Sequence, residues 1–122
     1  MRDLVAVYGS LKQGFHNHRW LENAPLFGEA ETPAKYTMYD AGRFPYLLEE
    51  GNTPIKVELY EVNDLILEGL DRLEGVKSGH YKRSKVETSL GEATIYVATE
   101  ETAKQVREYC KVVPSGNWEL PK

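Results

Sequence analysis

The sequence contains one cysteine, Cys110, so it cannot form an internal disulfide. A lone cysteine is typical of proteins from reducing compartments, because structural disulfides persist mainly in oxidising ones. The sequence also lacks a long apolar run and a charged leader followed by an apolar stretch. We therefore expect no membrane span and no secretory signal, and we predict a cytoplasmic protein without a membrane partner.

Basic residues are too few to indicate a nucleic-acid partner. Lys and Arg number 15 against 19 Asp and Glu, which gives a net charge of -4. Phosphate-binding surfaces need clustered positive charge, so nucleic acid is excluded as the main partner.

Motifs for metals, nucleotides and serine nucleophiles are missing as well. His16 and His18 have no Cys or HExxH context, and neither a GxGxxG motif nor a P-loop occurs. Ser10 lacks the Gly-x-Ser-x-Gly elbow, because Gly9 precedes it directly and Lys12 stands at the second glycine position. The sequence predicts a protein that uses neither a metal nor an organic cofactor.

What remains is the composition of one ordinary globular domain. The chain has 122 residues, 41% apolar and 28% charged, without repeats or a linker, and we expect residues 1–122 to form one domain. Residues 4–8 are a continuous apolar run ended by Gly9, the pattern of a strand buried on both faces. Other strands are predicted over residues 36–39, 46–48, 55–62, 81–88 and 93–98.

Two details refine the strand prediction. Pro45 restricts the strand at 46–48 to an edge or a strand start. Alternation shifts between Leu59 and Tyr60, which predicts a bulge near Leu59.

Helices are expected at three places. Asn63 caps one that reaches about Leu73, and a second begins near Thr99. A short third one, with Asn17 as its cap, is expected within residues 14–23. Strands interrupted by isolated helices predict an α+β domain with a mixed sheet that could close into a barrel.

Glu74 is the candidate for acid/base chemistry. On the helix from Asn63, positions 67, 70 and 74 share one face, and Leu67 and Leu70 make that face apolar. Burial and the negative end of the helix would both raise the pKa of this carboxyl towards neutrality, where it can accept and donate a proton. Periodicity leaves a second interpretation open, in which Glu74 lies in water and pairs with Lys77.

A second candidate feature is the exit of the first strand, residues 8–11. A buried strand that runs into Gly9 and Ser10 can turn sharply and expose successive N–H groups, which bind a carboxylate or an oxyanion. Taken alone, this segment is equally compatible with a structural turn.

These segments resemble the γ-glutamylcyclotransferase superfamily, in particular its γ-glutamylamine cyclotransferase, avirulence-induced-gene-like branch. The matching blocks occur in family order between Val7 and Trp118. They are residues 8–14, 17–18, 28–30, 44–47, 58–62 and 70–75. Residues 76–81 are closer to the branch that acts on γ-glutamyl amino acids and glutathione.

The resemblance implies a fold and a site. It implies a mixed β-barrel of roughly five to seven strands with two or three flanking helices. It also implies a small γ-glutamyl substrate that cyclises to 5-oxoproline and releases an amine. Glu74 would be the acid/base, and Tyr8, Gly9, Ser10 and Leu11 would bind the γ-glutamyl unit. Tyr81 and Tyr96 would line the pocket and Trp118 would sit over it, although Trp118 could equally anchor the tail.

Two other functions stay open on the sequence. One is a non-catalytic module that binds a glutamyl-like or carboxylate ligand, and the other is removal of a γ-glutamyl group from a biosynthetic intermediate. The leaving amine stays open between γ-glutamyl-ε-lysine, γ-glutamyl amino acids and glutathione as substrates, with small γ-glutamylamines slightly favoured. The chain is shorter than the glutathione-acting members, which leaves less loop to cover a large leaving group. The oligomeric state is not readable from the sequence.

Overall fold

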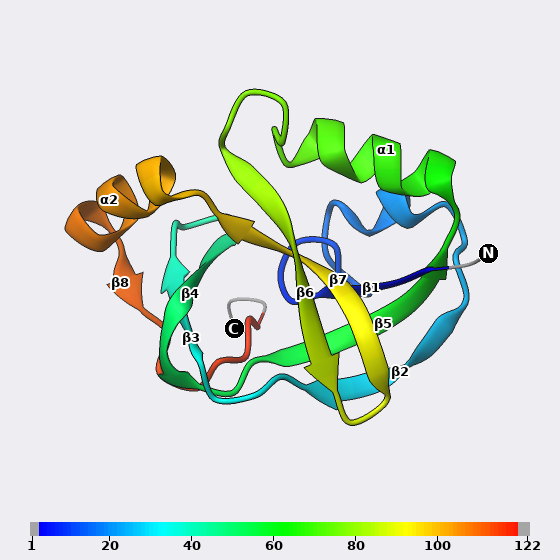
Figure 1. Ribbon diagram of the computed structural model, residues 1–122, viewed down its shortest axis with the longest axis horizontal. Coiled ribbons are helices and arrows are strands. Elements are labelled where there is room, and N and C mark those ends of the chain that lie inside the picture. The colour runs from blue at the N-terminus through cyan, green and yellow to red at the C-terminus, as the bar shows by residue number, and fades with distance from the viewer. Residues whose placement is uncertain (1–2, 120–122) are drawn as a thin grey trace.

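The computed structural model describes residues 3–119, which form an α+β fold (Figure 1). In chain order its elements are β1 Asp3–Val7, the 3-10 helix η1 His18–Leu21, β2 Leu26–Glu31, β3 Tyr36–Asp40, β4 Pro45–Thr53, β5 Lys56–Val62, α1 Asp64–Leu73, β6 Tyr81–Thr88, β7 Gly91–Ala98, α2 Glu100–Tyr109 and β8 Lys111–Val112. The predicted fold class is confirmed.

Within the described residues, the strands form two sheets. The larger has the order β2-β5-β1-β7-β6, and the smaller has the order β4-β3-β8. β1 and β7 run parallel, whereas every other neighbouring pair is antiparallel. The larger sheet is therefore mixed, as expected, and the smaller one is antiparallel, but over residues 3–119 hydrogen bonding does not run around one closed barrel.

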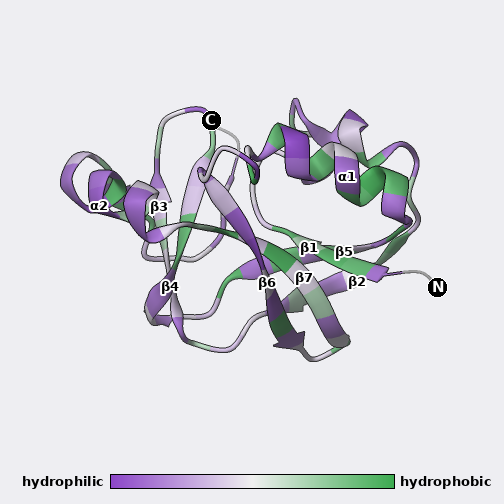
Figure 2. Cartoon of the chain, turned by 45° about the horizontal axis from the view of Figure 1, so that its top comes forward, coloured by the Kyte–Doolittle hydropathy of each residue, from purple (hydrophilic) through white to green (hydrophobic). Residues whose placement is uncertain are grey.

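β1 lies in the centre of the larger sheet and is covered on both faces. Val5 and Val7 pack beneath α1, while Ala6 joins the core between the two sheets. Figure 2 shows hydrophobic residues concentrated in the central strands and hydrophilic ones along α2. This double burial explains the uninterrupted apolar run in the sequence.

β5 has two buried faces, and an irregularity does lie near Leu59, as predicted. It occurs in the pairing of β5 with β2, where Leu26 pairs with Tyr60 and Gly28 with Leu59, so the extra residue is on β2 and not on β5. The pairing of β5 with β1 is continuous. Leu59 packs between the sheets and Tyr60 packs beneath α1, so adjacent residues are both buried. The alternation of apolar residues along β5 shifts because both faces of the strand are buried there, and β5 itself contains no extra residue.

The caps of both α-helices are those that the sequence predicts. The Asn63 side chain accepts a 2.9 Å hydrogen bond from the Ile66 N–H, and Thr99 caps α2. Gly75 follows α1 with a φ of 66°, which lets the chain leave the helix. No helix within residues 3–119 is long and apolar enough to cross a membrane.

Two further predictions concern the start of β4 and the short helix η1. Pro45 is the first residue of β4, an outer strand of the smaller sheet, as its missing N–H predicts. The helix expected within residues 14–23 is one 3-10 turn, His18–Leu21. Asn17 precedes it, but the Asn17 side chain makes no capping hydrogen bond, so that part of the prediction is wrong.

Candidate active site

A cavity of about 330 Å³ opens where β1 ends. β1 and β7 are parallel, so their carboxyl ends meet at the same edge of the sheet, where α1 also ends and β6 begins. The cavity is lined by Ala6, Val7, Tyr8, Gly9, Ser10, Leu11, His16, Asn17, Arg43, Phe44, Pro45, Leu73, Glu74, His80, Tyr81 and Tyr96. Elements distant in the sequence thus contribute to one concave site.

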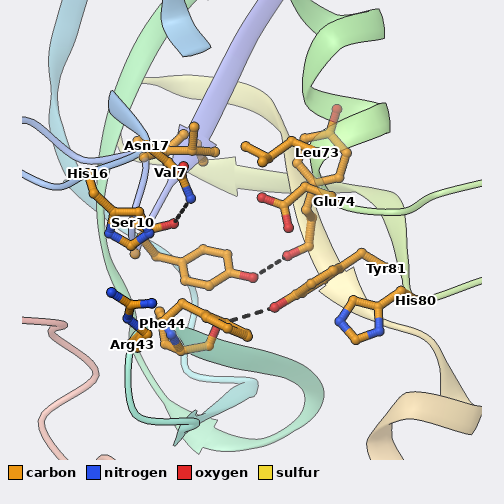
Figure 3. A pocket seen from close by; sticks show the side chains of 16 residues that line it. Val7, Ser10, His16, Asn17, Arg43, Phe44, Leu73, Glu74, His80 and Tyr81 are labelled. Atoms are coloured by element: carbon orange, nitrogen blue, oxygen red, sulfur yellow. Dashed lines mark hydrogen bonds between the residues drawn. The ribbon is translucent and has the colours of Figure 1, made fainter. Parts of the chain in front are cut away.

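The Glu74 side chain points into this cavity (Figure 3). Leu67 and Leu70, on the same face of α1, are buried, as the periodicity predicts. Burial raises the pKa of the Glu74 carboxyl from its ordinary 4.5 to about 7. No ion pair joins Glu74 to Lys77 within residues 3–119, so the alternative with a solvated Glu74 is wrong.

Two tyrosine hydroxyls lie close to Glu74. Tyr8 donates a 2.6 Å hydrogen bond to the backbone carbonyl of Tyr96, and Tyr81 donates one of 3.3 Å to that of Pro45. Burial raises both tyrosine pKa values, and the Glu74 charge raises them further. Both hydroxyls therefore stay protonated, and because their hydrogens are engaged, they face the cavity as hydrogen-bond acceptors.

The loop after β1 is held in place by residues that follow it. The Asn17 side-chain amide donates to the Ser10 hydroxyl at 3.0 Å, and the Asn17 N–H donates to the Ser10 carbonyl at 2.9 Å. His18 Nδ1 donates to the Leu11 carbonyl at 2.9 Å. Within the described residues, the N–H groups of Ser10 and Leu11 have no protein acceptor. The loop thus presents donors at the cavity, as the strand exit predicts.

Gly9 brings the loop against the start of β4. A Cβ at this position would lie 2.5 Å from Pro45 Cδ and 2.6 Å from Cγ, so no larger residue fits without movement. The missing side chain at Gly9 therefore lets the loop after β1 pack against Pro45.

His80 is held in the wall of the cavity by contacts with two tyrosines. Its Nε2 lies 2.9 Å from the Tyr46 hydroxyl, and its ring contacts Tyr81 edge-on at 4.9 Å. Burial lowers the pKa of the His80 imidazole, which favours the neutral ring.

Trp118 does not sit over the cavity, contrary to the expectation. It packs in the core between the sheets and does not belong to the cavity lining. Its backbone carbonyl accepts a hydrogen bond from Lys12 Nζ at 2.5 Å. Trp118 is therefore the tail anchor that the sequence left as the alternative.

Asn17, His16 and Arg43 are among the lining residues that were not predicted as parts of the site. Asn17 was interpreted as a cap, His16 was considered only as a metal ligand, and Arg43 carried no signal. Asn17 belongs to one of the matching blocks, so an alignment of these blocks could have indicated Asn17 as a residue of the site. His16 and Arg43 reach the cavity only through loop packing, which local patterns do not encode.

The site combines acceptors on one side with donors on the other. Figure 3 shows Glu74, Tyr81 and His80 across the cavity from Ser10, His16 and Arg43. No group of three or more His, Cys, Asp or Glu side chains within residues 3–119 could hold a metal ion. Fold and site together define a small α+β protein with a carboxyl of near-neutral pKa in a ligand-sized pocket.

The particular family follows from comparison with known proteins. Residues 5–120 match the family described as gamma-glutamyl cyclotransferase, AIG2-like, and the chain belongs to that family. The predicted resemblance is confirmed. The family indicates gamma-glutamylcyclotransferase-like activity on a small molecule.

Individual relatives agree with this assignment. A Vibrio cholerae protein with a provisional gamma-glutamylcyclotransferase name is 37% identical over 118 residues, covering 97% of this chain and 96% of its own. The solution structure of ytfP from Escherichia coli is 33% identical, covers 97% of this chain and 96% of its own, and has a TM-score of 0.69.

The fold also occurs as part of a larger protein. Allophanate hydrolase from Kluyveromyces lactis shares the fold with a TM-score of 0.72 at 18% identity, over 93% of this chain and 19% of its own. Function must therefore be argued from the side chains of the site.

Proposed function

We propose that this protein is a γ-glutamyl cyclotransferase, which releases 5-oxoproline and a free amine from a γ-glutamyl substrate. The observation that carries the proposal is the Glu74 carboxyl, which points into the cavity with a pKa near 7. At neutral pH both of its protonation states are populated, so the same group can act as base and then as acid.

The acceptor side of the cavity suits the α-ammonium of the substrate. Glu74, Tyr8 and Tyr81 all offer oxygen acceptors there, and the tyrosine hydrogens point to backbone carbonyls. An ammonium brings up to three donors, which matches this set. Bound there, the α-nitrogen would lie beside the base that must deprotonate it.

The donor side suits the α-carboxylate or the oxygen of the γ-carbonyl. The N–H groups of Ser10 and Leu11 have no protein acceptor within the described residues, and Asn17 donates to the Ser10 hydroxyl, whose hydrogen is left for a ligand. Preorganised donors at a developing oxyanion are typically worth about 3–4 kcal/mol each. The rigid loop would therefore bind substrate and stabilise the tetrahedral intermediate.

The reaction joins two parts of one molecule. Glu74 takes a proton from the α-ammonium, the freed amine attacks the γ-carbonyl carbon, and a carbon–nitrogen bond forms. The bond to the leaving nitrogen then breaks. Two protons in total move from the attacking to the leaving nitrogen, so the amine departs as an ammonium. Holding the substrate curled can supply on the order of 7–11 kcal/mol relative to separate reactants.

The test is a comparison of Glu74→Gln with Glu68→Gln. Both replace a carboxyl by its neutral isostere, but Glu68 is exposed on α1 and does not line the cavity. The proteins are incubated with a panel of γ-glutamyl amines and amino acids, and 5-oxoproline is measured by mass spectrometry. We expect the wild type and Glu68→Gln to turn over, and Glu74→Gln to lose at least about 10²-fold while still binding substrate.

Two outcomes contradict the proposal. Full activity in Glu74→Gln would remove this carboxyl from the mechanism. Tight binding of the panel by the wild type without any 5-oxoproline would instead support the non-catalytic binding module.

A further inference from the structure

Arg43 is held at the cavity by a tight turn between β3 and β4. Asp40 accepts a 2.7 Å hydrogen bond from the Gly42 N–H, and the Ala41 N–H donates to the Phe44 carbonyl at 3.1 Å. Gly42 has a φ of 96°, which an L-residue rarely adopts. The turn fixes the backbone so that the exposed Arg43 side chain reaches the cavity lining.

The Arg43 guanidinium has no partner among residues 3–119, in contrast to two other arginines. Arg83 donates to both Asp71 oxygens, and Arg107 pairs with Glu50 and Glu100. Within the described part of the chain, no hydrogen bond, ion pair or ring contact engages the side chain of Arg43. Its five N–H donors are therefore available to a ligand.

Few charged side chains line the cavity, and the Arg43 guanidinium is one of them. Among the lining residues, Glu74 is the one carboxyl, and Arg43 is the one side chain with a permanent positive charge. Figure 3 shows the two on opposite sides, with Arg43 beside His16. A ligand that spans the cavity meets an acid at one end and a guanidinium at the other.

A γ-glutamyl unit does not use all of these groups. Its ammonium matches Glu74 and the tyrosine oxygens, and its carboxylate matches the donors of the β1 exit loop, as proposed above. When the loop donors hold the glutamyl carboxylate, the guanidinium is left for a second anion, and the leaving amine is the part of the substrate that can carry one. Guanidinium and carboxylate fit each other through two parallel hydrogen bonds.

We propose that Arg43 selects leaving amines that carry a carboxylate, so that γ-glutamyl amino acids are preferred over uncharged γ-glutamylamines. This inference rests on the proposed cyclotransferase function and names its substrate class. It differs from the sequence-based preference for small γ-glutamylamines. Because Arg43 is exposed, we expect a preference on the order of tenfold in kcat/KM.

The test uses two substrates that differ in one group. γ-Glutamylalanine carries a carboxylate on the leaving amine, and γ-glutamylalaninamide has a neutral amide of the same size there. The wild type should prefer the first on the order of tenfold. Arg43→Gln should lose the preference through a higher KM for γ-glutamylalanine, with γ-glutamylalaninamide changed by less than about twofold.

Arg19→Gln is the matched control, because Arg19 is exposed on η1 and does not line the cavity. It removes the same charge and should keep the preference. Added salt should weaken the preference in the wild type and in Arg19→Gln, since the contact is open to solvent.

Three results would overturn the inference: two are read from turnover of the two substrates, and the third is a binding result that applies when neither substrate is turned over. Equal kcat/KM for both substrates in the wild type would show that no carboxylate is recognised. An equal loss on both substrates in Arg43→Gln would assign Arg43 to the carboxylate of the glutamyl unit.

If neither substrate yields 5-oxoproline, the proposed function fails, and calorimetry with both compounds then tests whether Arg43 still recognises the carboxylate. A lower Kd for γ-glutamylalanine that disappears in Arg43→Gln supports the role of Arg43, and equal Kd values overturn it.

Discussion

At the scale of single residues, the site depends on where hydrogens are directed. The Tyr8 and Tyr81 hydroxyls donate their hydrogens to backbone carbonyls. The Ser10 hydroxyl accepts a hydrogen bond from Asn17, and its own hydrogen remains available to a ligand. The neighbours of each polar group thus decide whether it faces the cavity as an acceptor or a donor. Glu74 is the exception, since its near-neutral pKa allows it to be either.

The raised pKa of Glu74 predicts a pH-dependent cost in stability. Because its pKa is about 7 in the folded state and 4.5 ordinarily, the folded state binds more protons between these values. Folding stability therefore falls as pH rises from 4.5 to 7. Glu74→Gln stays neutral and should be more stable than the wild type at pH 8, by on the order of 3 kcal/mol, with little difference at pH 4.

Urea unfolding at both pH values measures this effect. Glu68→Gln is the control, because the same change at an exposed position should leave the difference between pH 4 and pH 8 as in the wild type. If Glu74→Gln showed no gain at pH 8, the Glu74 carboxyl would have to be solvated.

At the scale of elements, α1 fixes both the position and the environment of Glu74. The helix begins at the Asn63 cap, presents Leu67 and Leu70 to the larger sheet, and ends at Gly75 with Glu74 as its C-cap. Glu74 thus lies at the negative end of the helix, an effect that also favours the protonated carboxyl.

The cap of α1 gives the prediction at this scale. Asn63→Ala removes the acceptor for the Ile66 N–H and should lower the free energy of unfolding by about 1 kcal/mol. Asn63→Asp keeps an acceptor and places a negative charge at the helix N-terminus, so it should retain the wild-type stability. Urea unfolding at pH 7 compares the variants, and an unchanged midpoint in Asn63→Ala would show that the cap contributes nothing.

At the scale of the whole molecule, the cavity is a product of how the two sheets meet. The larger sheet supplies the β1 exit loop and Tyr81, and the smaller sheet supplies Pro45 and the turn that carries Arg43. Contact between Gly9 and the Pro45 ring sets how closely these parts approach. A change at Gly9 should therefore affect stability and site geometry together.

Gly9→Ala tests this contact. Its new Cβ would lie 2.5 Å from a rigid, buried proline ring, so the sheets must shift, and we expect a loss of about 1–3 kcal/mol together with reduced activity. Gly69→Ala, within α1, is the opposite case, because the new Cβ would have no neighbouring atom closer than 3.9 Å. This substitution should stabilise the helix by up to about 1 kcal/mol. Thermal unfolding separates the two, and equal midpoints for Gly9→Ala and the wild type would contradict the sheet contact.

The sequence alone determined the features that depend on local rules. Strand periodicity, the caps at Asn63 and Thr99 and the stop at Gly75 all arise from residues within a few positions of one another. They were sufficient to place Glu74 at the end of a helix on its apolar face. The matching blocks added the family, because motifs keep their order along the chain.

Tertiary structure decided what depends on distant contacts. Packing against the parallel pair β1 and β7 settled whether Glu74 is sheltered, which periodicity had left open. Packing between distant segments also places Trp118 in the core, and Arg43 and His80 in the lining of the cavity. No local pattern encodes these placements, because each one depends on how two separately formed sheets pack together.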